Sequence, residues 1–503
     1  MPAPAATYAE FLERTREIFY LDSVSGLLGW DQQTMMPPGA VALRAAQSAL
    51  LAGLIHDRRT DPRLAELIEG LSANASQLDE DGRVNVREMR RVTERARKIP
   101  RELAREIAET QALSQQHWVE ARAASDFARF APWLEKMIAL RRSEADAIGY
   151  AESRYDALLD EYEPAMTASR VAKVFAELRP PLVELAAAIR DSGVVPRREL
   201  LTRRFPIERQ KEFGLWVIRR MGFDFTTGRV DISAHPFTSG NTTDVRLTTR
   251  FDERFLPAAL FGLIHEAGHG MYEQGLDARH QATPRATAIS LGIHESQSRM
   301  WENLVGRSLP FWRYAFPYLQ AFFPEETADI RLEEWYAAVN DVRPSLIRVE
   351  ADEVTYNLHI ILRFEIEKAL IEGQLRVADL PSVWNERFEE YLGIRPDRDA
   401  VGVLQDIHWS LGLVGYFPTY ALGNLYAAQF FRAAERAISG FPDRLAGGDF
   451  LALRDWLREN IHAPGQTYRA AELVQRVTGE PLSPRHLLES LRAKFAPLYR
   501  IRL

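Results

Sequence analysis

The chain contains no cysteine among its 503 residues. This absence excludes disulfides, cysteine nucleophiles, iron–sulfur ligation and thiolate zinc sites, so a protein-bound metal would need histidine and carboxylate ligands. Basic residues are not in excess either, because 63 Lys and Arg stand against 70 Asp and Glu and give a net charge of −7. Nucleic-acid binding requires a concentrated basic face. We therefore expect no nucleic-acid partner.

Two further absences concern location. The N-terminal residues show neither the basic nor the apolar segment of a signal peptide, which predicts a cytoplasmic protein. Residues 407–431 form a run of 25 without a charge, which is long enough to span a bilayer. The run contains His408, Asn424, Gln429 and several tyrosines, and a lipid-facing helix rarely has so many polar groups. We interpret it as protein interior beside a polar site and expect no membrane partner.

Most of the sequence has helical periodicity, and no repeat or low-complexity tract interrupts it. Residues 226–251 are the exception, because they are rich in Thr, Gly and Val with local alternation. They predict a hairpin or two small strands with Ser239-Gly240-Asn241 in the turn. The expected fold is all-α with this one small β element. We expect a single domain over residues 1–503, in which residues 1–100 form a helical lid subregion.

Five of the 11 histidines lie within residues 235–294, and two of them belong to the run HEAGH at 265–269. His265 and His269 are one helical turn apart, about 6 Å along the axis, so both imidazoles can reach one zinc ion. Glu266 is rotated from His265 by about 100° and can reach a zinc-bound water without ligating the zinc. This pattern predicts a zinc site in which Glu266 can serve as the base that accepts a proton from the zinc-bound water.

Catalytic zinc generally takes three protein ligands and leaves one position for water. Glu273 lies on the same helix face, but it is about 12 Å from His265 along the axis and cannot close the site. A returning antiparallel helix would bring a carboxylate back to the metal. Glu295, on the next predicted helix, is therefore the candidate third ligand, and its neighbour His294 is the alternative.

Several motifs in a fixed order resemble those of the carboxypeptidase Taq family of thermostable metallocarboxypeptidases. They are Trp30-Asp31-Gln32, His235-Pro236-Phe237, Asp244-x-Arg246-x-Thr248, HEAGH at 265–269, His294-Glu295-Ser296, Ile347-Arg348-x-x-Ala351-Asp352, Gly402-x-x-Gln405-Asp406-x-His408-Trp409 and Asn460-Ile461-His462. The resemblance spans nearly the whole chain without a departure at these positions. An ordered set of motifs is far more specific than one H-E-x-x-H run.

The resemblance implies that His265, His269 and Glu295 are the metal ligands and that Glu266 is the catalytic carboxylate. It implies a helical fold with a deep groove, similar to that of angiotensin-converting enzyme and neurolysin. It also implies a homodimer with one Zn²⁺, or alternatively Co²⁺, in each subunit. The implied activity is removal of residues with broad preference from peptides that have a free C-terminus.

The remaining candidates would contact the substrate. His235, His408, Tyr416 and Tyr420 could donate a hydrogen bond to the developing oxyanion; the alternative for each is a structural role in a buried groove. Arg348 could bind the substrate carboxylate, because a guanidinium offers two parallel donors. Its alternative is an ion pair with Asp352, four residues later on a helix expected over 345–372.

Three hypotheses about function follow. The first is a metal-dependent carboxypeptidase with broad specificity. The second is an endopeptidase or dipeptidyl carboxypeptidase that uses the same zinc chemistry. The third is a helical scaffold in which the H-E-x-x-H pair is incidental.

Overall fold

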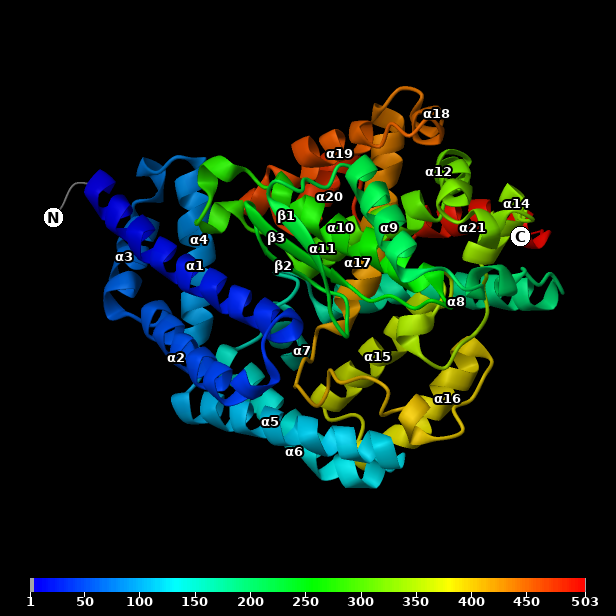
Figure 1. Cartoon of the computed structure of the whole chain (residues 1–503). Coiled ribbons are helices and arrows are strands. Elements are labelled where there is room, and N and C mark those ends of the chain that lie inside the picture. The colour runs from blue at the N-terminus through cyan, green and yellow to red at the C-terminus, as the bar shows by residue number, and fades with distance from the viewer. Residues whose placement is uncertain (1–3, 503) are drawn as a thin grey trace.

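The computed structural model describes residues 4–502, and helices make up most of it (Figure 1). The helices that precede the sheet are α1 (Pro4–Thr34), α2 (Val41–Arg59), α3 (Pro62–Ala73), α4 (Glu80–Lys98), α5 (Arg101–Ala124), α6 (Phe127–Ile148), α7 (Arg154–Leu159), α8 (Ala168–Asp191) and α9 (Ile207–Met221). Those that follow it are α10 (Leu256–Gly275), α11 (Leu291–Arg299), α12 (Leu309–Phe322), α13 (Pro324–Thr327), α14 (Leu332–Val339), α15 (Tyr356–Ile371), α16 (Leu380–Leu392), α17 (Phe417–Ala437), α18 (Phe441–Ala446), α19 (Leu451–Leu457), α20 (Ala470–Thr478) and α21 (Arg485–Tyr499). The predicted all-α class with a minor β element is confirmed.

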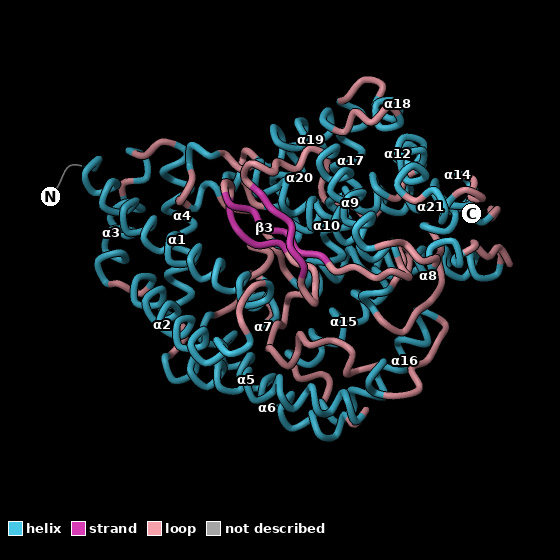
Figure 2. Tube along the Cα trace, in the orientation of Figure 1, coloured by secondary structure: helices cyan, strands magenta, loops and turns pink. Residues whose placement is uncertain are grey.

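The β element differs in detail from the predicted hairpin. It has three strands, β1 (Gly228–Ile232), β2 (Thr238–Asn241) and β3 (Asp244–Thr249), in the order β1-β3-β2 (Figure 2). The outer strand β1 pairs with β3 in parallel, whereas β2 pairs with it antiparallel. Residues 239–241 therefore lie within β2, and the turn falls on Thr242 and Thr243. The predicted turn was wrong because Asn241 pairs with Asp244 and closes a two-residue connection.

The first helices pack around a small apolar cluster of their own at one end of the molecule (Figure 1). Its members are Phe11, Ile18, Leu64, Leu67, Ile68, Leu71, Val86 and Met89. Most of the remaining apolar interior forms a second, much larger cluster. At the far end of α1, the ring of Trp30 lies 4.3 Å from the guanidinium carbon of Arg246 and 5.0 Å from that of Arg229. These contacts join the N-terminal helices to the sheet.

Helix α11 lies between α10 and α17, which places three helices around the candidate metal ligands. Two glycines permit this close packing. A Cβ atom on Gly268 of α10 would stand 2.6 Å from Cα of Ser298, and one on Gly423 of α17 would stand 2.6 Å from Cγ of Glu295. Both distances are too short for real atoms, so a larger residue at either position would push α11 away from the site.

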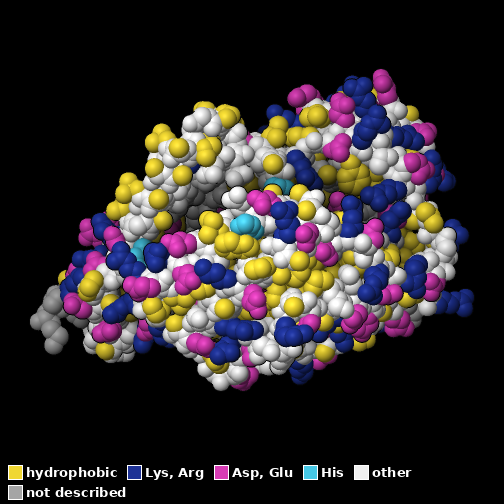
Figure 3. Space-filling view, turned by 90° about the horizontal axis from the view of Figure 1, so that it is seen from below, with side chains coloured by type: hydrophobic (Ala, Val, Ile, Leu, Met, Phe, Trp, Pro, Cys, Tyr) yellow, Lys and Arg dark blue, Asp and Glu magenta, His cyan; other side chains and the backbone are white. Residues whose placement is uncertain are grey.

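The uncharged run at 407–431 has no exposed residue, which confirms its interpretation as protein interior. Among the described residues, one other helical segment, Pro38–Arg59, is long and apolar enough to cross a membrane by length and composition alone, and 6% of its apolar window is buried. Val41, Leu43 and Leu50 are among its exposed side chains. In a space-filling view, one face of the molecule is hollowed between two lobes, and histidine side chains lie along the hollow (Figure 3).

Candidate metal centre and its surroundings

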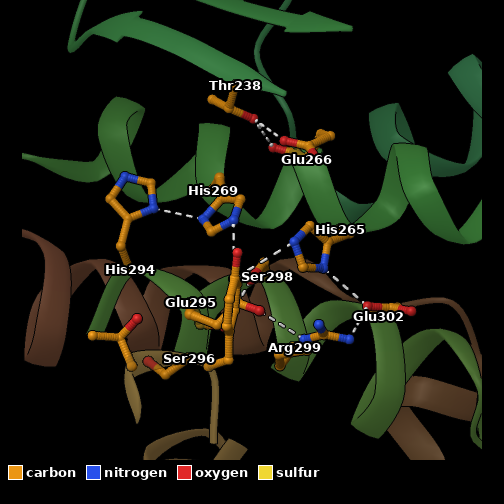
Figure 4. Close-up of polar contacts among 12 residues, drawn as sticks. Thr238, His265, Glu266, His269, His294, Glu295, Ser296, Ser298, Arg299 and Glu302 are labelled. Carbon is orange, nitrogen blue, oxygen red and sulfur yellow. Dashed lines mark hydrogen bonds and ion pairs between the residues drawn. The ribbon is translucent and has the colours of Figure 1, made fainter. Parts of the chain in front are cut away.

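His265 and His269 of α10 face Glu295 of α11, and the three side chains converge on one point (Figure 4). Nε2 of His265 lies 3.6 Å from Oε2 of Glu295, and Nε2 of His269 lies 3.3 Å from the same oxygen. Ligand atoms about 2 Å from a tetrahedral zinc ion are separated by about 3.3 Å. The spacing of these donors therefore fits a small divalent metal.

Local sequence explains why Glu295 returns to α10. Ser290 caps α11 by accepting a hydrogen bond from the backbone N–H of Ile293. A carboxylate oxygen of the buried Glu163 accepts the N–H of Gly292 and so fixes the first turn from outside. Beyond Arg299 the helix continues as a π-helical segment, Met300–Gly306. π-Helical turns are rare and often occur at functional sites.

Charged groups around the three side chains set their protonation. Burial opposes ionisation of Glu295, but Arg299 and the two histidines outweigh it and hold the pKa of Glu295 well below its usual range. Burial lowers the pKa of His269 to about 3, which leaves that imidazole neutral. His265 differs, because Glu295 and Glu302 outweigh burial and raise its pKa. A proton and a metal would therefore compete for Nε2 of His265.

Glu266 lies on the other side of α10, beside the sheet (Figure 4). The hydroxyl of Thr238 on β2 lies 2.7 Å from Oε2 of Glu266 and 3.0 Å from its backbone carbonyl. Burial raises the pKa of the Glu266 carboxyl, which suits a group that must accept a proton near neutral pH. The small sheet therefore positions the candidate base, a role that sequence patterns did not assign to Thr238.

His294, the alternative ligand, does not face Glu295. Its Nδ1 lies 2.5 Å from Nδ1 of His269, and its Nε2 lies 2.9 Å from Oε1 of Glu273. The structure thus places His294 behind His269, and the cluster of potential metal donors contains Glu295 instead. Glu273, which is too far from His265 to close the site, contacts His294.

Arg299 and Glu302 also surround the cluster and were not identified from the sequence. Nε of Arg299 lies 2.8 Å from Oε1 of Glu295, and Oε2 of Glu302 lies 2.9 Å from Nδ1 of His265. A signal for Arg299 exists, because it is four residues after Glu295 on the same helix. Glu302 offers no such signal, since it lies in the π-helical segment, where the usual helical spacing does not apply.

Arg348 lies in a second cluster, on a different segment from the one predicted. The helix expected over 345–372 begins only at Tyr356, and Arg348 belongs to a short 3-10 turn, Arg348–Glu350. The alternative interpretation of Arg348, an ion pair with Asp352, is wrong, because Asp352 instead accepts the backbone N–H groups of Val354 and Thr355 before α15. Arg348 pairs with Asp406, with 2.9 Å between Nη2 and Oδ1.

Asp406 also pairs with Arg363 of α15, with 2.6 Å between Nη2 and Oδ2. Two buried guanidinium groups thus share one carboxylate. Although burial opposes ionisation, their charges hold the pKa of Asp406 far below its usual range. The cluster retains a surplus positive charge. Nη1 of Arg348 also lies 3.2 Å from the hydroxyl of Tyr356, whose ring faces Arg299 at 4.3 Å. Tyr356 therefore joins this cluster to the metal donors.

The other candidates for substrate contact divide into two groups. His408, Tyr416 and Tyr420 lie together: Nε2 of His408 is 3.3 Å from the hydroxyl of Tyr420, and the rings of Tyr416 and Tyr420 are 5.4 Å apart. The ring of Tyr420 also lies 5.1 Å from the guanidinium carbon of Arg348. His235 is separate from them, exposed in the segment between β1 and β2. Among residues 4–502, its one hydrogen bond is accepted by its backbone carbonyl from the hydroxyl of Ser233.

A family model and curated relatives match nearly the whole chain. Residues 10–495 match the family model described as carboxypeptidase Taq (M32) metallopeptidase. A relative from Thermus thermophilus called thermostable carboxypeptidase 1 is 47% identical over 99% of both chains. Carboxypeptidase 1 of Bacillus subtilis is 39% identical over 97% of this chain and 98% of its own.

Solved structures show the same fold. The crystal structure of an M32 carboxypeptidase from Deinococcus radiodurans superposes with a TM-score of 0.96 at 43% identity, and the match covers 99% of this chain and all of the other. A carboxypeptidase structure from Pyrococcus furiosus superposes with a TM-score of 0.94 at 38% identity, covering 97% and 99% of the two chains.

Proposed function

Because the chain belongs to the carboxypeptidase Taq (M32) metallopeptidase family and is a metallocarboxypeptidase, we propose that it holds one Zn²⁺ between His265, His269 and Glu295, with Co²⁺ as an alternative. The observation that supports this most directly is the convergence of these three donors within 4.8 Å of one another. Histidine nitrogen and carboxylate oxygen are the donor set of catalytic zinc sites. When bound, such a metal polarises a carbonyl and acidifies a water molecule.

The other steps of catalysis are assigned to side chains around the metal site. Glu266, held by Thr238, accepts the proton of the attacking water and returns it to the leaving amine. Its raised pKa favours this exchange. Three polar side chains lie together and are candidates to donate a hydrogen bond to the oxygen of the reacting carbonyl: His408, Tyr416 and Tyr420. His235, in the exposed segment before β2, remains a further candidate to donate this hydrogen bond.

Arg348 binds the C-terminal carboxylate of the peptide in this proposal. The surplus positive charge of the pair Arg348 and Arg363 around Asp406 supports this role. The cluster is buried, and a charge-assisted contact there is stronger than at the surface. Tyr356 contacts both Arg348 and Arg299, and Arg299 in turn contacts the proposed ligand Glu295. The two clusters are therefore close enough for one peptide end to contact both.

We extend the proposal to the organisation of the enzyme. Residues 1–100 act as a lid within a single domain of 503 residues, which the separate apolar cluster of these helices supports.

The exposed apolar side chains of α2, such as Leu43 and Leu50, support a homodimer, because such a surface favours burial against another protein. The enzyme works in the cytoplasm. Sedimentation of the purified protein and fractionation of cells test these last two points.

Two measurements test the proposed activity. Metal analysis of the purified protein should find one zinc or cobalt ion per subunit. A peptide with a free C-terminus should be shortened from that end, whereas the same peptide with an amidated C-terminus should resist. Equal cleavage of both peptides would indicate an endopeptidase and contradict carboxylate recognition. Absence of stoichiometric metal from the active protein would contradict the proposed centre.

A further inference from the structure

The two candidate histidine ligands have different partners behind them. Nδ1 of His265 faces a carboxylate directly, that of Glu302 at 2.9 Å. Nδ1 of His269 faces a second imidazole, that of His294 at 2.5 Å. His294 in turn faces the carboxylate of Glu273 at 2.9 Å. Nδ1 of His265 thus contacts a carboxylate directly, whereas Nδ1 of His269 is connected to one through the ring of His294. Figure 4 shows the ring of His294 beside His269.

Hydrogen-bond chemistry fixes the protons along this chain of three residues. If Nε2 of His269 gives its lone pair to a metal, the proton of that ring is on Nδ1. Nδ1 of His294 must then accept, so the proton of His294 is on Nε2. That proton points at Oε1 of Glu273, which is an acceptor when ionised. One arrangement of protons therefore satisfies every contact and leaves Nε2 of His269 free.

The two carboxylates also differ in what else they contact. Glu302 lies 3.3 Å from Arg299 and 3.4 Å from Arg307, so part of its charge is balanced by cations. Glu273 has no lysine or arginine partner within residues 4–502, and His294 is its one ion-pairing neighbour there. The negative charge of Glu273 is therefore not balanced by a cationic side chain among these residues, and its carboxylate interacts with the His294 ring. Packing keeps His294 in place, since its ring lies 5.1 Å from that of Tyr272.

We propose that Glu273 and His294 form a relay of hydrogen bonds that fixes the tautomer and orientation of His269 and thereby raises the affinity of the metal centre. Neither residue touches the metal, and both are positioning residues. The inference rests on the proposed metal site and adds to it a pair of residues that sets its strength. Outer partners of this kind typically contribute 10–100-fold to metal affinity.

Matched substitutions at His294 test the relay. Asn places an acceptor oxygen where Nδ1 of His294 lies, whereas Leu has nearly the same shape without an acceptor. His294→Leu should weaken zinc binding by about 10–100-fold, and His294→Asn should restore most of the loss. The measurement is competition for Zn²⁺ against a chromophoric chelator. The visible absorption of the Co²⁺-loaded protein should shift in the Leu variant, because the His269 ring loses its fixed orientation.

A double-mutant cycle then tests whether Glu273 acts through His294. Glu273→Met should weaken zinc binding in the wild-type background, and Glu273→Gln, which keeps an acceptor, should weaken it less. In the His294→Leu background, Glu273→Met should cost nothing further. His462→Gln is the control, because the ring of His462 also lies 5.1 Å from that of Tyr272 but bonds to Gln297 rather than to a candidate ligand. Its zinc affinity should equal that of the wild type.

Distinct outcomes would overturn the two proposals. If the wild type binds Zn²⁺ tightly, and the Leu and Asn variants of His294 bind it equally well, the relay is wrong while the metal centre stands. Full additivity of Glu273→Met and His294→Leu would also refute the relay. A wild-type protein that binds neither Zn²⁺ nor Co²⁺ would refute the metal centre, and the relay with it.

Discussion

The metal donors and the arginine cluster lie side by side but are built in opposite ways. His265, His269 and Glu295 come from two consecutive helices, and the carboxylates of Glu295 and Glu302 face the two imidazoles. Arg348 and Asp406 come from a short 3-10 turn and a loop, and cations outnumber the carboxylate between them. The first arrangement suits a bound cation. The second suits a bound anion, such as the end of a peptide.

In the proposed reaction, the two clusters would bind different parts of the substrate. A carbonyl must be polarised at one point, and a carboxylate must be held a fixed distance beyond it. Tyr356 links the two clusters, because its ring faces Arg299 and its hydroxyl contacts Arg348. Substitutions on the metal side should impair cleavage of every peptide, whereas those on the arginine side should impair only cleavage that depends on a free C-terminus.

The largest expected effect is that of Glu295→Ala. It leaves two of the three proposed protein ligands and removes the carboxylate that Arg299 contacts. Zinc affinity should fall by more than the 10–100-fold that an outer partner contributes, and activity on every peptide should be lost. The measurement is zinc content after dialysis against a mild chelator. Retention of zinc by Glu295→Ala together with its loss from His294→Ala would make His294 the ligand.

Glu266→Gln should act on the same side without removing the metal. The amide keeps the shape of the side chain, and it can still accept the hydrogen bond from Thr238, but it cannot accept a proton. Loss of a general base typically lowers the rate by 10²–10⁴-fold. Zinc content should remain stoichiometric, and kcat should fall. Wild-type turnover, or complete loss of zinc, would contradict the assigned role.

The sequence could predict those residues of the metal site that regular helical spacing brings together. His265, His269 and Glu266 are fixed by helical spacing, and Glu295 follows from a returning helix. Thr238 and Glu302 could not be found in this way, because a strand and a π-helical turn bring them to the site.

On the arginine side, local spacing gave the wrong partner. As the alternative to carboxylate binding it offered an Arg348–Asp352 pair on one helix, but Asp352 accepts the N–H groups of Val354 and Thr355 in the turn before α15, and α15 begins only at Tyr356. The actual partner, Asp406, is 58 residues away from Arg348 in the chain. A contact at that separation depends on how the 3-10 turn of Arg348 packs against the loop before α17, which no local pattern encodes.

Arg348→Ala tests the arginine side with an intermediate effect. Loss of a charge-assisted contact of roughly 1.5–3 kcal/mol should lower kcat/KM on free peptides by about 10–150-fold. Arg348→Lys should not restore it fully, since an ammonium lacks the paired donors of a guanidinium. An amidated peptide should be cleaved equally poorly by both proteins.

Arg246→Ala is the control for this substitution, because Arg246 contacts Trp30 and Asp244 rather than Asp406. It should leave the preference for a free C-terminus unchanged. If Arg348→Ala lowers thermal stability but keeps the wild-type ratio between free and amidated peptides, Arg348 serves only the ion pair with Asp406. Arg363 would then be the next candidate to bind the carboxylate.

The smallest effect on activity should come from Glu367→Gln. This substitution tests how Glu367 holds the loop before α17, which contains Asp406. Glu367 accepts hydrogen bonds from Trp409 and Gly415 of that loop and from Tyr155. Burial raises its pKa from the ordinary 4.5 to about 7. The folded protein therefore binds a proton that the unfolded chain releases between these values. The stability that this proton adds is complete below pH 4.5 and is lost as pH rises through 7.

A glutamine resembles the protonated acid and has no such dependence on pH. The free energy of unfolding of the wild type, minus that of Glu367→Gln, should thus fall as pH rises from about 4.5 to 7 and then level off, by at most about 3 kcal/mol. Urea unfolding at several pH values measures this difference, in which all unchanged groups cancel. A difference that rises with pH would mean that Glu367 is ionised in the folded protein. The surplus positive charge of the nearby arginines would then be balanced from within, which would weaken the case for a substrate carboxylate at Arg348.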